Sequence, residues 1–277
     1  MHLNLLGSGG AVSFPRPCCE CKLCEKARKQ GPPYTRTGPS LYCYDEAVLF
    51  DTPDEICYQL EREKIKKVDH IFYTHWHPDH TQGARLVEHK HFGYMREPKR
   101  KPTNIYIPDR AYLDFEKFVP QLFYWQKQYD IKIHKIKDRK SVRIGKVSVT
   151  PINFFRSDRE RFAYLIEEGD KRVMYAPCSV FEAKIDRFWK DLDVLIMELG
   201  WFGNTKALRA KGRYPVYQDH ISFEENIELV KLLKPRKTIL THIEGTRHIT
   251  LEEVTKAVAP YKKLNVSPAI DGMHIRI

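Results

Sequence analysis

Short apolar runs alternate with stretches of helical periodicity along most of this chain. A run rich in Leu, Ile, Val, Phe or Tyr that ends at a turn residue predicts a strand. By this pattern we expect strands over 2–9, 40–45, 47–52, 67–75, 104–109, 130–136, 146–154, 162–169, 171–177, 193–199, 237–243 and 271–277. Apolar side chains at helical intervals, as at Ile56 and Leu60, predict helices over 54–65, 83–92, 110–120, 182–191, 222–233 and 250–258. Strands and helices mixed in this way predict a layered α/β protein, in which helices cover sheets.

A chain of 277 residues is long enough for one large domain with a buried core. Apolar residues make up 42% and aromatic residues 12%, which is typical of a globular protein and not of a disordered one. No low-complexity linker interrupts the sequence, so we expect a single domain over residues 1–277. No run of about 18 apolar residues is present, which argues against a membrane-spanning helix. The start, MHLNLLGSGG, does not resemble a signal peptide, and we therefore expect a cytoplasmic protein.

The chain is basic, with 47 Lys and Arg against 36 Asp and Glu and a net charge of +11. Such an excess favours an anionic partner, either a phosphorylated small molecule or a nucleic acid. A basic surface without a particular ligand is the alternative. The long polar connection over 204–220 carries four cations that we expect to bind an anionic substrate, unless they are only a solvated face: Lys206, Arg209, Lys211 and Arg213. The sequence is compatible with a homodimer but does not establish one.

The segment THWHPDH, residues 74–80, gathers metal-ligating side chains directly behind a predicted buried strand. His75 and His77 can point to one side, while Asp79 and His80 follow in the turn that leads into a helix. Imidazole and carboxylate groups are usual ligands of zinc, iron and manganese, and two neighbouring groups of ligands can hold two ions. A solvated histidine-rich loop is the alternative. Four ligands in six residues behind a buried strand favour the metal site.

The pattern His75-x-His77-x-Asp79-His80 resembles the hallmark motif of the metallo-β-lactamase superfamily. This resemblance implies an αββα sandwich, two mixed sheets flanked by helices, with a metal site on the loops at one edge. The segments LLGSGGAVSFPRPCCECKLCEKAR, ILTHI and AIDGMHI resemble the phosphoribosyl cyclic phosphate phosphodiesterase subgroup. The same start and finish also resemble the pyrroloquinoline quinone biosynthesis B proteins. The intact metal motif and the segment DHISFEEN favour the phosphodiesterase subgroup.

The resemblance implies further ligands from later loops. His242, at the end of a predicted strand, matches the distal histidine of the family. It would complete one half of the site with Asp79 and His80. The other half would contain His75 and His77.

Two positions depart from the family pattern. The histidine expected after the strand SVTPINF is absent, and Arg156 or Ser157 stands nearest in register. The bridging aspartate expected after the strand KRVMYAP is replaced by Cys178, whose thiolate can bind or bridge metals and suits zinc or iron better than magnesium or calcium. Three outcomes remain open: Asp158 supplies the missing ligand, the second half-site stays weak or open, or a single metal serves another reaction.

A cysteine-rich knuckle spans residues 18–24. Three of its thiols have a spacing that suits one zinc ion, Cys19, Cys21 and Cys24. Crowding of this kind favours metal binding in a reducing compartment over a disulfide framework. In the phosphodiesterase subgroup the motif holds a structural zinc, completed by a histidine at the position where this chain has Gly245. We expect His248 to replace it, with Cys18 as the other candidate and reactive thiols without a metal as the alternative.

The metal site and its surroundings imply a hydrolytic mechanism. Water bound to such ions has a lowered pKa, so that hydroxide exists near neutral pH, and Asp79 would orient this hydroxide. A leaving alkoxide needs a proton, and a histidine can deliver it near physiological pH. His220 matches a histidine that lies beside the substrate in the subgroup, and we expect it to be this donor. A helix-capping or surface histidine is the alternative.

These observations predict a metal-dependent hydrolase, a phosphodiesterase that cleaves a small cyclic or ribosyl phosphate through metal-activated water. We expect one structural zinc ion in the knuckle and one or two zinc, manganese or iron ions in the active site. An RNA-processing nuclease is an alternative that the net charge favours. An iron-dependent oxygenase or biosynthesis protein of the quinone-biosynthesis B type is a second alternative, which Cys178 and the missing histidine favour. A non-catalytic protein that only binds a ligand is the third.

Overall fold

The computed structural model describes residues 1–93, 101–153, 160–178, 180, 185–202, 220–245 and 249–277. The strands are β1 (His2–Gly7), β2 (Ser40–Cys43), β3 (Val48–Phe50), β4 (His70–Phe72), β5 (Thr103–Pro108), β6 (Ile131–Ile136), β7 (Val142–Ile144), β8 (Val147–Asn153), β9 (Phe162–Glu168), β10 (Lys171–Ala176), β11 (Val194–Glu198), β12 (Lys237–Thr241), β13 (Val266–Pro268) and β14 (Met273–Arg276). The α-helices are α1 (Lys22–Gln30), α2 (Ile56–Arg62), α3 (Pro78–Thr81), α4 (Leu86–His91), α5 (Tyr112–Phe118), α6 (Gln121–Gln128), α9 (Phe223–Leu233) and α10 (Leu251–Val258). Short 3₁₀ helices cover Gln82–Arg85, Asp109–Ala111, Arg187–Trp189 and Ala259–Leu264. None of the described helices combines the length and the apolar character that crossing a membrane requires.

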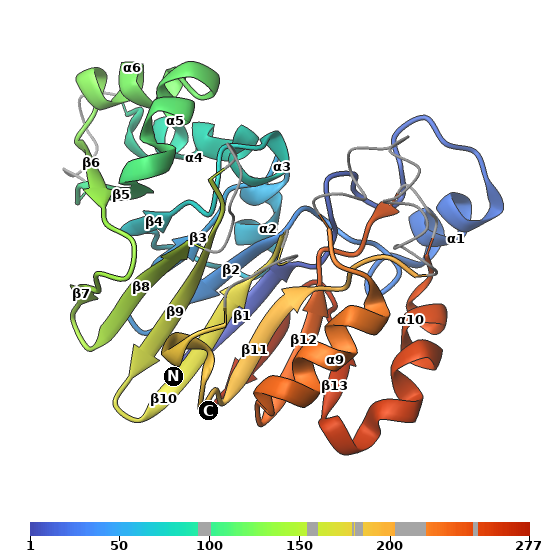
Figure 1. The fold of residues 1–277 in the computed structure, drawn as a ribbon. Coiled ribbons are helices and arrows are strands. Elements are labelled where there is room, and N and C mark those ends of the chain that lie inside the picture. The colour runs from blue at the N-terminus through green and yellow to red at the C-terminus, as the bar shows by residue number, and fades with distance from the viewer. Residues whose placement is uncertain (94–100, 154–159, 179, 181–184, 203–219, 246–248) are drawn as a thin grey trace.

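The strands form two seven-stranded sheets (Figure 1). The first has the order β14-β1-β2-β3-β4-β5-β6, and the second has the order β13-β12-β11-β10-β9-β8-β7. Both sheets are mixed, because β3 to β6 and β10 to β13 pair in parallel while the other neighbours are antiparallel. The last strand, β14, pairs with the first, β1, so the two ends of the chain meet in one sheet.

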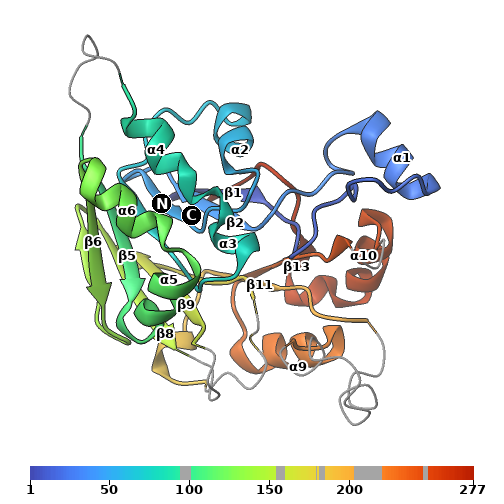
Figure 2. The same ribbon diagram turned by 90° about the horizontal axis from the view of Figure 1, so that it is seen from above.

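Three apolar layers hold the sheets and helices together. Alternate side chains along a strand point to opposite faces, so each sheet contributes to two layers. Between the sheets, Leu3, Phe50 and Phe72 of the first pack in one cluster with Tyr164 and Val173 of the second. Helices α2, α4, α5 and α6 cover the outer face of the first sheet, and α9 and α10 cover that of the second (Figure 2). This arrangement confirms the predicted αββα sandwich.

The helix predicted over 182–191 is wrong in its described part. Only the 3₁₀ turn Arg187–Trp189 is helical there, and the backbone of Lys190 is already extended. Asp186 begins the turn, because its carboxylate accepts a hydrogen bond from the amide of Phe188 at 3.0 Å. Trp189 is fully buried in the cluster beneath the second sheet, so a tertiary contact and a polar cap, rather than helical periodicity, decide the local structure.

The strand predicted over 67–75 is shorter than expected. It is reduced to β4, because the amide of Thr74 donates to the side chain of Asp51 at 2.8 Å instead of to a neighbouring strand. Five described helices and strands were missed, namely α1, α3, α6, β7 and β13. Helix α1 illustrates why: its sequence KLCEKARKQ is mostly charged and buries only Cys24 and Ala27, which leaves little apolar pattern to detect.

A buried carboxylate joins the N-terminal loop to the segment before β14. Asp271 Oδ1 accepts from the amide and hydroxyl of Ser8 at 2.8 and 2.7 Å. Its Oδ2 accepts from the amide and hydroxyl of Thr37 at 2.8 and 2.6 Å, and Arg62 Nη1 lies 3.4 Å away. Five donors on one buried carboxylate tie the first loops of the chain to its last strand.

Substitution of Asp271 therefore tests how the two ends of the chain are held. We expect Asp271→Ala to lower the free energy of unfolding by about 3 kcal/mol, because buried donors lose their acceptor. Urea unfolding measures the change. Asp170→Ala, at an exposed residue whose ion pair with Lys171 lies at the surface, is the control and should leave the free energy of unfolding nearly unchanged. Equal stability of the two variants would contradict the role of Asp271.

Candidate metal centre

The candidate ligands lie on loops that follow strands of both sheets. One group follows β4 and enters α3, and the others follow β10 and β12: His75, His77, Asp79, His80, Cys178 and His242. Because β10 and β12 both pair in parallel with β11, their carboxyl ends share one edge of the second sheet. Figure 1 shows α3 close to that edge. Residues far apart in the sequence therefore meet at one end of the sandwich.

Asp51, at the end of β3, fixes the turn that carries the first ligands. It is fully buried and has a positive φ of 60°. Its Oδ1 accepts the amide of Thr74 at 2.8 Å, and its Oδ2 lies 2.8 Å from His80 Nδ1. The hydroxyl of Thr74 also contacts His75 Nδ1 at 3.0 Å. With both Nδ1 atoms held in this way, His80 and His75 keep Nε2 for a ligand, as in metal sites where a carboxylate or hydroxyl orients the imidazole.

Two groups of three ligands share His80. In the first, ligand atoms of Asp79, His80 and His242 lie within 4.8 Å of one another, and Asp79 Oδ2 is 3.3 Å from the Nε2 atom of each histidine. In the second, ligand atoms of His75, His80 and Cys178 lie within 4.8 Å. The structure thus brings five of the six predicted ligands together.

The cluster has the electrostatics of a cation site. The Nε2 atoms of His75, His80 and His242 are buried and make no hydrogen bond. A buried polar atom without a hydrogen bond is costly, so these three atoms, which lie in two ligand groups that share His80, fit a bound cation. Burial alone would lower the pKa of His80, but the carboxylates of Asp79 and Asp51 raise it well above its usual value. The same carboxylates that favour a proton on this ring would favour a metal ion in its place.

Cys178 stands in the cluster as a thiolate. Its side chain is buried, and burial alone raises the pKa of a thiol. The charge of His242, side-chain contacts with His242 and His80, and the charge of Arg161 outweigh burial and lower the pKa of Cys178 to about 5. A thiolate is a strong, soft ligand for zinc or iron, so the replacement of the expected aspartate keeps a negative ligand in the cluster.

His77 is placed differently from the other histidines. It is the N-cap residue of α3 and is only partly buried. Its ring packs against that of His75, with centroids 4.6 Å apart. Neither group of three ligands includes His77. Among the described residues, His75 is therefore grouped with His80 and Cys178, and not with its predicted partner.

Glu244 supports the distal histidine and was not found from the sequence. His242 Nδ1 lies 3.4 Å from Glu244 Oε1, which also accepts the amide of Ala11 at 3.0 Å. Gly10 allows this close packing, because a Cβ there would lie 2.3 Å from Glu244 Oε1 and 2.9 Å from His242 Nδ1. The signal in the sequence was a carboxylate two residues after a predicted ligand, together with the glycine pair at 9–10.

His220 forms a buried pair with Glu198, the last residue of β11. Its Nδ1 lies 2.6 Å from Glu198 Oε2, while Oε1 accepts the amide of Val180 at 2.7 Å. Burial alone would lower the pKa of His220, but the charge and hydrogen bond of Glu198 raise it above its usual value. The rings of His220 and His242 are 6.0 Å apart, which places the pair beside the cluster. Glu198 was missed, although a carboxylate that ends the apolar strand DVLIMEL was a detectable signal.

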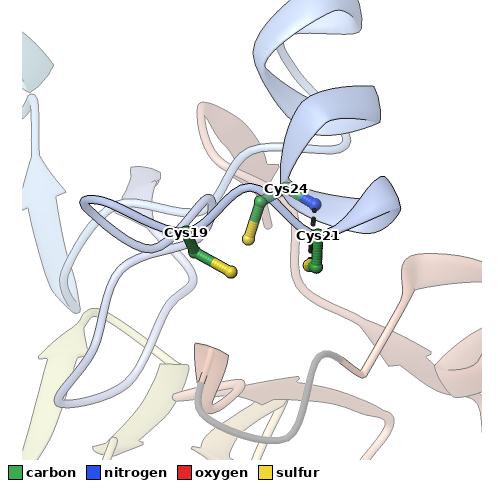
Figure 3. A group of neighbouring side chains, drawn as sticks. All are labelled: Cys19, Cys21 and Cys24. Carbon is green, nitrogen blue, oxygen red and sulfur yellow. Dashed lines mark hydrogen bonds between the residues drawn. The ribbon is translucent and has the colours of Figure 1, made fainter.

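The thiols of the predicted knuckle gather near α1 (Figure 3). The sulfur atoms of Cys19, Cys21 and Cys24 lie within 4.8 Å of one another. Cys21 is the N-cap of α1, and its sulfur accepts the amide of Cys24 at 3.5 Å, a contact that lowers the pKa of Cys21. Cys18 is exposed and belongs to no such group. Three converging sulfur atoms suit one zinc ion.

Several predicted residues lie outside the described part of the chain. These are the candidate knuckle ligand His248, the basic residues Lys206, Arg209, Lys211 and Arg213, and the three residues considered for the missing ligand, Arg156, Ser157 and Asp158. Their assignments stay predictions.

Comparison with known proteins places this arrangement in a family. A model of the β-lactamase superfamily domain matches residues 47–243. Ribonuclease Z of Thermococcus onnurineus (strain NA1) is 31% identical over 142 residues, which are 50% of this chain and 43% of that protein. The chain thus spans less than half the length of this relative.

Two solved structures share the fold over the whole chain. The crystal structure of a diphosphatase from the PhnP family has a TM-score of 0.75 at 22% identity and covers 100% of this chain and 97% of that chain. The Zn²⁺-bound structure of PqqB from Methylobacterium extorquens has a TM-score of 0.72 at 17% identity and covers 100% of both chains. The domain match includes β3 to β12 and every ligand of the cluster, and the chain therefore belongs to the metallo-β-lactamase superfamily.

Proposed function

We propose that the protein is a metal-dependent phosphodiesterase that cleaves a small cyclic or ribosyl phosphate. The observation that carries the proposal is a cluster of four side chains that could bind a metal ion, Asp79, His80, His242 and Cys178. The cluster lies beside the pair formed by His220 and Glu198. Support for phosphate chemistry comes from the names of two relatives, a diphosphatase and a ribonuclease, since both types of enzyme cleave bonds to phosphorus.

Each residue of the cluster has a distinct role in this proposal. Asp79, His80, His242 and Cys178 would hold zinc, manganese or iron, and a bound ion of this kind supplies a Lewis acid that activates water and neutralises phosphate charge. Asp51 and Glu244 orient the two histidine rings through their Nδ1 atoms. Asp79, which contacts both rings, also orients the attacking water.

His220 completes the proposed reaction by protonating the leaving group. Because Glu198 raises the pKa of His220, it favours the protonated ring, in which Nε2 carries a proton. An alkoxide leaving group takes this proton as the bond to phosphorus breaks. We further propose that the basic residues Lys206, Arg209, Lys211 and Arg213 bind the anionic substrate.

An RNA-processing nuclease is the second candidate for the same site. The 31% identity to ribonuclease Z and the net charge of +11 favour it. An iron-dependent oxygenase or biosynthesis protein of the PqqB type is the third, because Cys178 supplies a sulfur ligand that suits iron. Activity against a small phosphodiester and against a structured RNA separates the first two, and oxygen consumption identifies the third.

The cluster can be tested by hydrolysis of bis(p-nitrophenyl) phosphate with added Zn²⁺ or Mn²⁺. We expect His80→Ala to lower kcat/KM by about 10³-fold, because this residue belongs to both ligand groups. His89→Ala, at an exposed histidine of α4, is the matched control and should keep the wild-type rate. Absence of hydrolysis by the wild-type protein with zinc, manganese and iron would refute the phosphodiesterase proposal.

The role of His220 can be tested through the leaving group. We expect His220→Ala to slow hydrolysis of an alkyl phosphodiester by about 10²-fold or more, but that of a p-nitrophenyl diester far less, because p-nitrophenolate leaves without a proton. Glu198→Gln should change the rates in the same direction, whereas Glu224→Gln, at an exposed residue of α9, should change neither. An equal loss with both substrates would show that His220 is not the proton donor.

We also propose that Cys19, Cys21 and Cys24 hold a structural zinc ion with His248. Elemental analysis of Cys21→Ser should show one zinc ion fewer per chain and a lower melting temperature, because a closed zinc site stabilises the fold that forms it. Cys57→Ser, outside the knuckle, should keep its zinc. Loss of zinc from Cys18→Ser but not from His248→Ala would identify Cys18 as the fourth ligand, and unchanged zinc in Cys21→Ser would exclude the knuckle site.

We propose, finally, that residues 1–277 act as one domain. The two sheets share a single buried layer, and β14 joins the end of the chain to β1.

A further inference from the structure

A buried cation stands on the His75 side of the cluster. Arg161 is only 3% exposed and lies directly before β9. The amide of the next residue, Phe162, donates to the carbonyl of Thr74 at 3.2 Å, so the backbone of Arg161 runs beside the turn that carries His75. The guanidinium charge lowers the pKa of both His75 and Cys178, although burial and His80 act more strongly on His75, and His242 acts more strongly on Cys178.

In the part of the chain that the structure describes, the ligands on this side do not suffice for a second ion. Among the described residues, His75 is grouped only with His80 and Cys178, both of which lie close to His242 and its ion site. His77 belongs to neither group. The sequence also has no histidine after the strand SVTPINF, where the family pattern expects one. From the described residues, a metal ion there would have one ligand of its own, His75, and it would face the positive charge of Arg161.

The other side of the cluster has a complete ligand set. Asp79 Oδ2 lies between the rings of His80 and His242. The Cys178 thiolate adds a fourth donor through its contacts with both histidines. Two imidazoles, a carboxylate and a thiolate make a four-ligand set that suits zinc or iron. The ligands among residues with a described position therefore fit one ion well and two ions poorly.

We propose that the centre binds a single metal ion, and that the guanidinium of Arg161 supplies on the His75 side the positive charge that a second ion would supply. The proposal rests on the proposed function, because that charge is useful where a phosphate group is bound. A guanidinium can donate two parallel hydrogen bonds to phosphate oxygens and stays charged at all relevant pH values. Arg161 is thus a substrate-binding residue.

The proposal can be tested by counting metal ions, without any substrate. Purified protein is loaded with Zn²⁺ or Mn²⁺, passed through gel filtration and analysed by element. The number of ions in the centre is the metal content per chain of the wild-type protein minus that of His80→Ala. This variant lacks the ligand that is common to both groups. Ions bound by the knuckle are present in both proteins and are removed by the subtraction. We expect one ion in the wild-type centre, one in Arg161→Lys, which keeps the charge, and two in Arg161→His, which replaces the cation by a ligand.

Two ions in the wild-type centre would overturn the proposal, and this result does not depend on how any Arg161 variant folds. A single ion in Arg161→His would also overturn it, provided that the variant unfolds in urea at the wild-type midpoint. If the urea midpoint of Arg161→His is lower, the proposal is judged by the number of ions in the wild-type centre and by the inhibition of hydrolysis by inorganic phosphate. Phosphate should inhibit Arg161→Gln at least about 10-fold less well than wild type, with Arg161→Lys between the two because it keeps the charge but loses the second hydrogen bond. Equal inhibition of wild type and Arg161→Gln would contradict the role of Arg161.

These outcomes separate the inference from the proposed function. A centre with one ion and no hydrolysis of any phosphodiester would refute the phosphodiesterase and leave the ion count standing. A centre with two ions and normal hydrolysis would refute the inference alone.

Discussion

The hydrogen bonds of the Asp51 carboxylate hold together the turn on which the metal centre depends. Asp51 ends β3 at a positive φ and binds both the amide of Thr74 and the ring of His80. Because Asp51 binds the amide of Thr74, β4 ends at Phe72, His75 lies outside the sheet and α3 begins at Pro78. Without this buried acceptor, the segment that follows β4 would lose the hydrogen bonds that hold its turn toward the second sheet.

The second sheet supplies the remaining ligands, which also lie directly after the ends of strands. Cys178 and His242 follow strands that run parallel to β11, and Glu198 ends β11 itself. Each ligand ring is held by a partner on its far side, with Asp51 behind His80 and Glu244 behind His242. Rings oriented in advance lose little entropy when an ion or substrate binds, which is the usual function of such supporting carboxylates.

Much of this arrangement could be predicted from the sequence, because it depends on local signals. The apolar runs located the strands of both sheets except β7 and β13. THWHPDH together with His242 pointed to five residues that the structure places at one end of the sandwich, four of them within the ligand groups. The supporting residues escaped prediction for a physical reason. Asp51, Glu198 and Glu244 act through contacts between loops distant in sequence, and no periodicity marks such contacts.

Arg161 was missed for a related reason. An arginine at the start of a strand is most often a surface residue, and only its burial and its position beside Thr74 distinguish it. Helix α1 escaped because its residues are mostly charged, and the helix expected over 182–191 failed in its described part because Trp189 and Asp186 shape a tight turn. At these positions tertiary packing, rather than local secondary-structure propensity, determines the structure.

The most direct test of the account is anomalous diffraction at the metal absorption edge from crystals of the metal-loaded protein. The account predicts one peak in the centre, bounded by Asp79, His80, His242 and Cys178, and no second peak on the side of His75 and Arg161. Two peaks in the centre, or one peak held by His75 and His77 instead, would contradict it.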